Sequence, residues 1–466
     1  MAINIPLCVA VVCFLTGYFL KVDVAQRISQ HVESYQQINC TKVGAGYLHG
    51  PEDMALDVVN NILWISSYDR RLNPDNGILH PIDIITNKDV PISATFPPNF
   101  RPHGVAIAQG CEPAQDHQQP PGSTVTRLFA ISHPVGIALA PKEGTTVRNR
   151  DLPHTIEVFD FFYSPTNVSA AILKHVMTSK HRYLNSPNDL IALSCIEVVV
   201  SNDLPKGDIL NVLSDLIQKS RGATMVHHNI KVNSWAQLAE SRTTEAVLAT
   251  PPKGMKKRFE DSGITPKTTV MTTSNIPVVA SFGNGLIMLP HDRSSETDTS
   301  QFPSLLLRAS SADYTLLQYE FKYIDGQVKL TLQQEVSLPI SPDNIEPCPW
   351  NPMEVLITGH PSVAMFLLHA LPLPEAVRAT APSMVLRYNA LLRNYTVLYY
   401  SSGEEMSASS VAVMIPASSP GVGMIASAGS HDQDNDTEEY NGHAGDGKLY
   451  IGQVFDPFVL VCDLHQ

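Results

Sequence analysis

The sequence predicts an all-β fold made of many short strands. Short apolar runs recur along the chain, and turn-forming residues follow each run. The 35 prolines and 26 glycines are spread over the 466 residues, a distribution that disfavours long helices. From these patterns alone a sandwich, a barrel and a propeller stay open, because no internal repeat is evident.

Each expected strand is one of these apolar runs. In chain order the runs are Ile62–Ser66, Gly104–Ala108, Leu128–Ser132, Thr155–Phe161, Leu190–Val200, Val278–Leu289, Ser304–Ala309, Tyr314–Tyr323, Val355–Thr358, Ser383–Tyr388, Tyr395–Tyr400, Ser410–Ile415 and Lys448–Val454. Four stretches between strands are interpreted as insertions, at 110–124, 205–262, 291–301 and 416–446. The second of these stretches contains a helix that the pattern predicts, Lys206–Lys219.

The N-terminal residues predict a route out of the cytosol. Residues 2–20 are almost wholly apolar, which is typical of a secretory signal peptide or an uncleaved signal anchor. We therefore divide the chain into a signal segment at 1–21, a short helical segment at 22–39 and one domain at 40–466. The expected location is secreted or endomembrane, with membrane anchoring if the segment is retained. Four glycosylation sequons fit this route, at Asn39, Asn167, Asn394 and Asn435.

Charge and cysteine content disfavour two classes of function. The chain has 32 basic and 45 acidic residues, a net charge of −13, and no basic patch with interleaved aromatics. Such a chain repels phosphate backbones, so we expect no nucleic-acid partner. None of the seven cysteines forms a CxxC pair, which disfavours a zinc site. An oxidising compartment would permit disulfides.

Paired oxygen-bearing side chains indicate a hard cation. Pro51-Glu52-Asp53 and Pro187-Asn188-Asp189 each place two such side chains next to one another at the end of a predicted strand. Neighbouring strand residues point to opposite faces, so each pair can supply one oxygen ligand to each of two sites. Ser341-Pro342-Asp343-Asn344 and Phe282-Gly283-Asn284-Gly285 carry the same oxygen chemistry. Carboxylate and amide oxygens suit calcium, which takes roughly six to eight oxygen ligands.

Several segments of the chain resemble the paraoxonase/arylesterase family of calcium-dependent lactonases and esterases. The matching segments follow one another in order from about Cys40 to Cys462, separated by the insertions. They are GPEDMAL (50–56), LWISS (63–67), RPHG (101–104), ISHP (131–134), PNDLIAL (187–193), SND (201–203), FGNG (282–285), SPDNI (341–345), TGHP (358–361), SSVA (409–412) and GKLYIGQVF (447–455). Each motif is weak alone, but their common order is specific.

The resemblance implies a six-bladed β-propeller with two calcium ions in its central tunnel. It assigns the catalytic ion to five side chains, namely Glu52, Asn188, Asn284, Asp343 and Asn344. It assigns the deeper, structural ion to Asp53, Asp189 and the backbone carbonyl of Val105. The same resemblance implies a disulfide between Cys40 and Cys462, and it leaves the pairing of Cys111, Cys195 and Cys348 open.

Two histidines carry the catalytic expectation. By resemblance, His103 in RPHG is the general base that activates the hydrolytic water, and His133 in ISHP is its partner. Histidine titrates near neutrality, so it can accept a proton from water. The role of His360 in TGHP is less defined. The chain has no G-x-S-x-G elbow, so a serine nucleophile is not expected.

The sequence therefore predicts a calcium-dependent hydrolase of aryl esters and lactones that acts on a small-molecule substrate. Two alternatives stay open at this stage. One is a propeller that keeps calcium for stability and acts as a binding scaffold. The other is a propeller similar to gluconolactonase or strictosidine synthase. The 205–262 segment and the ASSADY stretch around Ala309–Tyr314 depart from the family, so substrate preference is the least defined part of the prediction.

Overall fold

A computed structural model shows the arrangement of most of the chain. It describes residues 38–71, 77–113, 125–133, 154–163, 171–181, 183–184, 186–203, 225–229, 273–276, 282–289, 304–324, 327–370, 378–416 and 447–464. Several expected segments lie outside the described residues, wholly at 1–21, 206–219 and 291–301. The same holds for 22–39 apart from residues 38–39, for 110–124 apart from 110–113, for 416–446 apart from Pro416, and for the sequons at Asn167 and Asn435.

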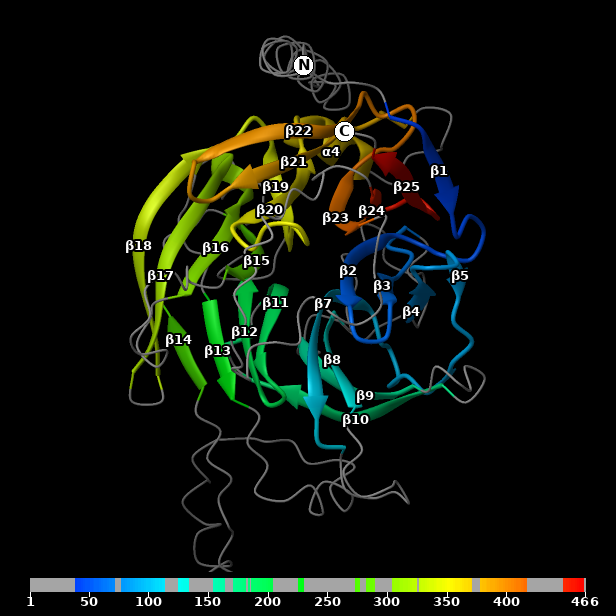
Figure 1. The fold of residues 1–466 in the computed structure, drawn as a ribbon, viewed down its shortest axis with the longest axis vertical. Coiled ribbons are helices and arrows are strands. Elements are labelled where there is room, and N and C mark those ends of the chain that lie inside the picture. The colour runs from blue at the N-terminus through cyan, green and yellow to red at the C-terminus, as the bar shows by residue number, and fades with distance from the viewer. Residues whose placement is uncertain are drawn as a thin grey trace, which may run out of the picture.

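Six sheets stand in a ring around a central axis (Figure 1), and their strands pair antiparallel except β6 (Ser93–Ala94), which pairs parallel with β10 (Ile172–Lys180). The first blade consists of β2 (Pro51–Asp57), β3 (Ile62–Ser67), β4 (Ile78–Asp83) and β5 (Lys88–Asp89). The second consists of β7 (Pro102–Cys111), β8 (Val125–Ser132), β9 (Thr155–Phe162), β10 (Ile172–Lys180) and β6 (Ser93–Ala94). The third consists of β11 (Pro187–Ser194), β12 (Glu197–Asn202), β13 (Met225–Asn229) and β14 (Thr273–Ile276).

The remaining blades complete the ring. The fourth consists of β15 (Gly283–Leu289), β16 (Ser304–Ser310), β17 (Thr315–Ile324) and β18 (Gln327–Ser337). The fifth consists of β19 (Ser341–Pro347), β20 (Glu354–His360), β21 (Ser383–Asn389) and β22 (Asn394–Ser401). The sixth consists of β23 (Ser409–Pro416), β24 (Gly447–Gln453), β25 (Val459–Leu464) and β1 (Cys40–Val43). A short 3-10 helix, η4 (Ser311–Asp313), follows β16, and a helix, α4 (Val363–Ala370), follows β20. The all-β, six-bladed prediction is confirmed.

The ring is closed by its innermost strands. Each first strand of a blade contacts the first strands of both neighbouring blades, from β2 through β7, β11, β15, β19 and β23 back to β2. Apolar side chains fill the wedges between blades. For example, the buried Trp64 of the first blade meets Phe161 of the second edge-on, with 4.8 Å between ring centroids. Polar side chains therefore converge at the ends of the innermost strands, close to the central axis.

The last blade joins the two ends of the domain. The N-terminal strand β1 pairs with the C-terminal strand β25, and Cys40 lies directly opposite Cys462. These cysteines form a disulfide, as expected, across a sequence separation of 422 residues. A second disulfide joins Cys111 to Cys195 and connects the second and third blades, a pairing that the sequence left open. Cys348 is unpaired and buried. Two disulfides are typical of an extracellular or secreted protein.

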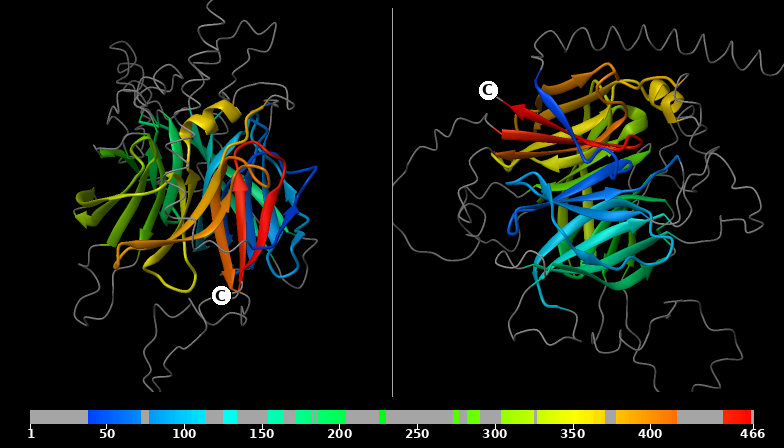
Figure 2. Two further views of the ribbon diagram at one scale, coloured as in Figure 1. Left: turned by 90° about the horizontal axis from the view of Figure 1, so that it is seen from above. Right: turned by 90° about the vertical axis from the view of Figure 1, so that its right-hand side faces the viewer.

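Three local features differ from the sequence-based strands. The run Leu190–Val200 is split by a turn at residues 195–196 into β11 and β12, because the chain reverses there. Strand β13 lies inside the 205–262 stretch that we interpreted as an insertion, so residues 225–229 belong to a blade. The helix α4 was not expected, since its sequence VAMFLLHA is apolar on all sides. Figure 2 shows α4 on one face of the ring.

Two further expectations concern the surface and the membrane. Asn39 and Asn394 are exposed, as a glycosylated asparagine must be. Within the described ranges, no helix combines the length and the hydrophobicity needed to span a membrane.

Loss of the disulfide between the chain ends should destabilise the domain most. On the chain-entropy model, closing a loop of 422 residues stabilises the fold by about 6 kcal/mol, compared with about 4.5 kcal/mol for a loop of 84 residues. We expect Cys40→Ser/Cys462→Ser to lower the free energy of unfolding in urea more than Cys111→Ser/Cys195→Ser does. Equal stability of the first double variant and the parent would show that β1 is held by strand pairing alone.

Candidate functional site

A backbone irregularity recurs at the start of every innermost strand. In all six blades the pairing of the first two strands shifts register within the first few residues. Such bulges bend a strand and re-aim its side chains. The residues that lie between the shifted pairs include Glu52, His103, Asn188, Asn284, Asp343, Asn344 and Ser410. The bulges therefore present one set of polar side chains per blade to the tunnel.

Glycines let these strand starts approach one another. A Cβ at Gly104 would lie 2.7 Å from the carbonyl oxygen of Asn188, and one at Gly285 would lie 2.6 Å from that of Asp343. These contacts are too short for any side chain, so the glycines of RPHG and FGNG are required by close packing between blades. The motifs thus pair a functional residue with the glycine that positions it.

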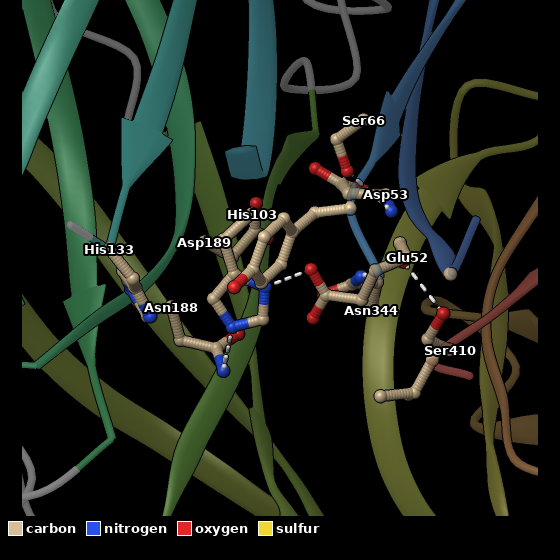
Figure 3. Close-up of polar contacts among 12 residues, drawn as sticks. Glu52, Asp53, Ser66, His103, His133, Asn188, Asp189, Asn344 and Ser410 are labelled. Atoms are coloured by element: carbon tan, nitrogen blue, oxygen red, sulfur yellow. Dashed lines mark hydrogen bonds and ion pairs between the residues drawn. The ribbon is translucent and has the colours of Figure 1, made fainter. Parts of the chain in front are cut away.

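Glu52, His103 and Asn188 form the centre of the site (Figure 3). The Glu52 carboxylate contacts Nδ1 of His103, and the Asn188 amide nitrogen lies 3.3 Å from His103 Nε2. The backbone carbonyl of Glu52 accepts hydrogen bonds from Ser410 Oγ at 2.7 Å and from Asn344 Nδ2 at 3.2 Å. Five blades therefore hold or contribute this group of residues.

These contacts define the protonation of His103. A carboxylate only accepts, so the proton of His103 is on Nδ1, and Nε2 carries the lone pair that faces the Asn188 amide N–H. Burial lowers the pKa of His103 to about 3, and the nearby His154 lowers it as well. The imidazole is therefore neutral at physiological pH, with its acceptor nitrogen directed at the centre of the site.

His133 packs against His103 but does not share a hydrogen bond with it among the contacts of the described residues. The two rings meet edge to face, with 4.6 Å between centroids, and His154 packs on the other side of His133 at 4.7 Å. His133 Nε2 lies 2.6 Å from the carbonyl oxygen of Pro187 and donates to it. His133 is thus placed to fix the ring of His103 by contact.

The fourth and fifth blades supply the other side of the site. The amide nitrogen of Asn284 donates to Asp343 Oδ1, and His360 Nε2 lies 3.3 Å from Asp343 Oδ2. The ring of His360 stacks on Phe366 of α4, with 4.2 Å between centroids. Phe366 therefore connects helix α4 to this side of the site.

Two amide oxygens of this group have no partner among the described residues. Oδ1 of Asn188 and Oδ1 of Asn284 are buried and make no hydrogen bond within this part of the chain. A buried polar atom without a partner costs about 1–3 kcal/mol, and native structures rarely keep one. Both atoms belong to the set that the sequence assigned to the catalytic ion. Unpartnered amide oxygens beside Glu52 and Asp343 carboxylates fit a hard, oxygen-loving cation.

Asp53 and Asp189 lie deeper and are held apart from the first group. Asp53 accepts hydrogen bonds from the backbone N–H groups of Met54 and Val105, and Asp189 from those of Leu190 and Leu286. The doublets Glu52-Asp53 and Asn188-Asp189 are thus divided, the first member of each facing His103 and the second facing backbone N–H groups.

The two deeper carboxylates repel one another. Burial, followed by the charges of Asp189 and Glu346, raises the pKa of Asp53 well above its usual range. Burial also raises the pKa of Asp189 to about 7, although two backbone N–H groups donate to it. In the described part of the chain neither carboxylate has an ion-pair partner. Two buried carboxylates without a positive partner favour protonation or a cation.

Three of the five side chains assigned to the catalytic ion are asparagines, so a search for clustered His, Cys, Asp and Glu side chains does not identify the site. Among the described residues, no three His, Cys, Asp or Glu side chains are clustered closely enough to hold a metal on their own. The expected ligand sets rely instead on amide and backbone oxygens, as calcium sites do.

Three charged residues of the site were missed in the sequence. Arg70 Nη2 donates to Glu52 Oε2 at 2.8 Å and lies 3.2 Å from His103 Nδ1. Asp203 is hydrogen-bonded to Asn188, and Glu346 raises the pKa of Asp53. A signal was present for Asp203 in the SND motif, whereas Arg70 and Glu346 belong to no motif that we identified.

Comparisons with known proteins add little to this geometry. No known family profile matches the chain, and no curated protein matches its sequence. Solved structures with a similar arrangement include a luciferin-regenerating enzyme, with 9% identity, a TM-score of 0.41 and coverage of 92% of this chain and 96% of that chain. A second is an aldose sugar dehydrogenase from Streptomyces coelicolor with bound PQQ, with 11% identity and a TM-score of 0.38, covering 92% of this chain and 98% of that chain. A third is a candidate 6-phosphogluconolactonase from Bacteroides fragilis, with 9% identity and a TM-score of 0.31, covering 75% of this chain and 70% of that chain. Such low scores support no conclusion about function or family.

Calcium should stabilise the parent chain and fail to stabilise Asp189→Asn. A cation that binds only the native state adds about 4 kcal/mol at a thousandfold excess over Kd. We expect this gain, measured by urea unfolding with and without chelator, to be largely lost in Asp189→Asn. In chelator the variant should unfold close to the parent, because it removes a repelling charge.

The matched control is Asp463→Asn, which removes an exposed carboxylate of β25. This variant should keep the full calcium gain. An undiminished gain in Asp189→Asn would exclude this carboxylate as a ligand.

Proposed function

We propose that the chain is a calcium-dependent hydrolase of lactones and aryl esters, related to the paraoxonase/arylesterase family. The observation that carries the proposal is the pair of buried, unpartnered amide oxygens of Asn188 and Asn284 beside a neutral histidine whose lone pair faces the same centre. Oxygen donors and a proton acceptor at one point are what hydrolysis of a carbonyl compound with a metal requires.

The cation would be held by the side chains of the bulges. Its donors are the carboxylates of Glu52 and Asp343 and the amide oxygens of Asn188, Asn284 and Asn344, while Asp53, Asp189 and Val105 hold the deeper ion. When bound, calcium supplies a Lewis acid for the carbonyl oxygen of an ester or lactone.

His103 supplies the base. Its Nε2 is unprotonated and faces Asn188, so it can accept a proton from a water molecule that takes the place of the amide N–H. Glu52 accepts the Nδ1 proton and thereby stabilises the imidazolium that forms. His133, fixed by its hydrogen bond to Pro187, keeps the ring of His103 in this orientation.

The proposed location follows the disulfides and the N-terminal sequence. An apolar segment at 2–20 and two disulfides favour a secreted chain, or one that an uncleaved segment holds at a membrane.

His103→Gln should separate catalysis from cation binding. Loss of a general base costs roughly two to four orders of magnitude in turnover. We expect this loss for a panel of lactones and aryl esters, with calcium content and melting temperature unchanged. Glu52→Gln should lose turnover and also bind calcium more weakly, since it removes a charged donor.

His80→Gln is the matched control, because His80 lies on β4 and pairs with Asp89 away from the tunnel. It should retain parental turnover. Near-full activity of His103→Gln would reassign the base, and a parent chain that hydrolyses nothing in the panel while binding calcium would favour the scaffold function.

A further inference from the structure

Among the described residues, the guanidinium of Arg101, two positions before His103, has no partner. Arg101 has only 6% of its surface exposed, and its Nε and Nη1 atoms are buried without a hydrogen bond in this part of the chain. Arginine stays charged at all physiological pH values, so it cannot avoid the cost of burial by losing its proton. A buried charge normally has a counter-ion, because removal from water costs several kcal/mol. The guanidinium of Arg101 therefore has hydrogen-bond donors available for an anion.

The backbone places Arg101 at the strand start that carries His103. Arg101 directly precedes β7 and lies two residues before His103. Two hydrogen bonds fix the backbone of Arg101. Its N–H donates to Ser132 Oγ at 3.1 Å, and its carbonyl accepts from the N–H of His133 at 3.0 Å. The guanidinium thus starts from a rigid position beside the base.

A second guanidinium faces the same aromatic ring. The Cζ atoms of Arg101 and Arg70 lie 5.5 Å and 5.9 Å from the ring centroid of Tyr68, which is buried. Arg70 is anchored by Nη1, which donates to the carbonyl oxygens of Gly50, Tyr68 and Val454 at 3.2–3.4 Å. Its other nitrogen, Nη2, donates to Glu52 Oε2, the oxygen that also accepts the Nδ1 proton of His103. Arg70, Tyr68 and Arg101 therefore form a cationic wall, which Arg70 connects to the reacting centre through Glu52.

The charge balance of this wall favours an anionic guest. Glu52 is the carboxylate that pairs with Arg70, and in the proposed function Glu52 is shared with a divalent cation. Asp69 uses Oδ1 to accept the backbone N–H of Arg71. The charges of Asp343 and Asp69 also act on Arg70, whereas Arg101 has no ion pair among the described residues. A forked guanidinium pairs best with a carboxylate, which it can bind through two hydrogen bonds.

We propose that Arg101, assisted by Arg70, binds a carboxylate group of the substrate, so that the preferred substrates are acidic lactones and esters. This inference rests on the proposed hydrolase and names its substrate class. The carboxylate would accept hydrogen bonds from the guanidinium of Arg101, and the substrate would then extend toward Glu52 and His103.

A matched substrate pair tests this inference. One substrate is a γ-butyrolactone with a carboxylate on the γ-carbon of the ring. The other carries a primary carboxamide at the same carbon. The calcium-loaded parent chain should prefer the carboxylate in kcat/KM by about tenfold or more, the worth of a charge-assisted hydrogen bond. In Arg101→Gln this preference should fall toward unity, mainly through KM. Arg101→Lys, which keeps the charge but loses the fork, should fall between the two.

Arg393→Gln is the control, because Arg393 is an exposed arginine in the turn before β22 and the substitution is the same. Its preference should equal that of the parent. Calorimetry with α-hydroxyglutarate, the ring-opened product, measures anion binding without turnover and should show about tenfold weaker binding to Arg101→Gln.

The two measurements separate the inference from the proposed function. Equal kcat/KM for the two lactones, with α-hydroxyglutarate binding unchanged in Arg101→Gln, would overturn the anion site and leave the hydrolase intact. Binding of α-hydroxyglutarate that depends on Arg101, with no turnover of either lactone or of any member of the lactone and aryl-ester panel, would support the anion site and exclude the hydrolase.

Discussion

The structure depends on one geometric constraint, namely that six strand starts meet at the tunnel axis of a closed ring. Each start carries a bulge, and the bulges turn a polar side chain from every blade toward the same small volume. A regular strand would alternate its side chains and could not do this with two adjacent residues. Glycine at residues 104 and 285 allows the backbones to close together behind these side chains. The ring therefore determines the site, and the blades behind it supply the core.

The same convergence creates an electrostatic problem that a cation would solve. Asp53 and Asp189 are buried side by side, and burial and mutual repulsion raise the pKa of Asp53 well above its usual range. At the other group, Asn188 and Asn284 leave oxygens without partners. Folding brings these atoms together at a cost that hydrogen bonds within the chain do not offset. Cation binding and folding should therefore be coupled, so that the ion strengthens the ring from which its ligands come.

Much of the fold was predictable, and the reasons are local. Short apolar runs and turn residues predicted an all-β chain, and ordered motifs predicted six blades through resemblance. The repeat itself was not recognised, because only a few residues recur per blade, such as Pro51-Glu52-Asp53 and Pro342-Asp343-Asn344. Pairing of Cys111 with Cys195 depends on the register of neighbouring blades, which no local pattern encodes. Arg70 and Arg101 acquire their meaning from packing around Tyr68, so the sequence alone showed neither as part of the site.

The central claim is that oxygen atoms of the bulges hold calcium at the tunnel axis. Equilibrium dialysis of the folded chain against radioactive calcium, after prior removal of metal, measures this directly. Two ions bound per chain, displaced by excess unlabelled calcium and not by magnesium at the same concentration, are expected, since calcium accepts the larger and less regular oxygen shell. A folded chain that retains no calcium at saturating concentrations would contradict the claim.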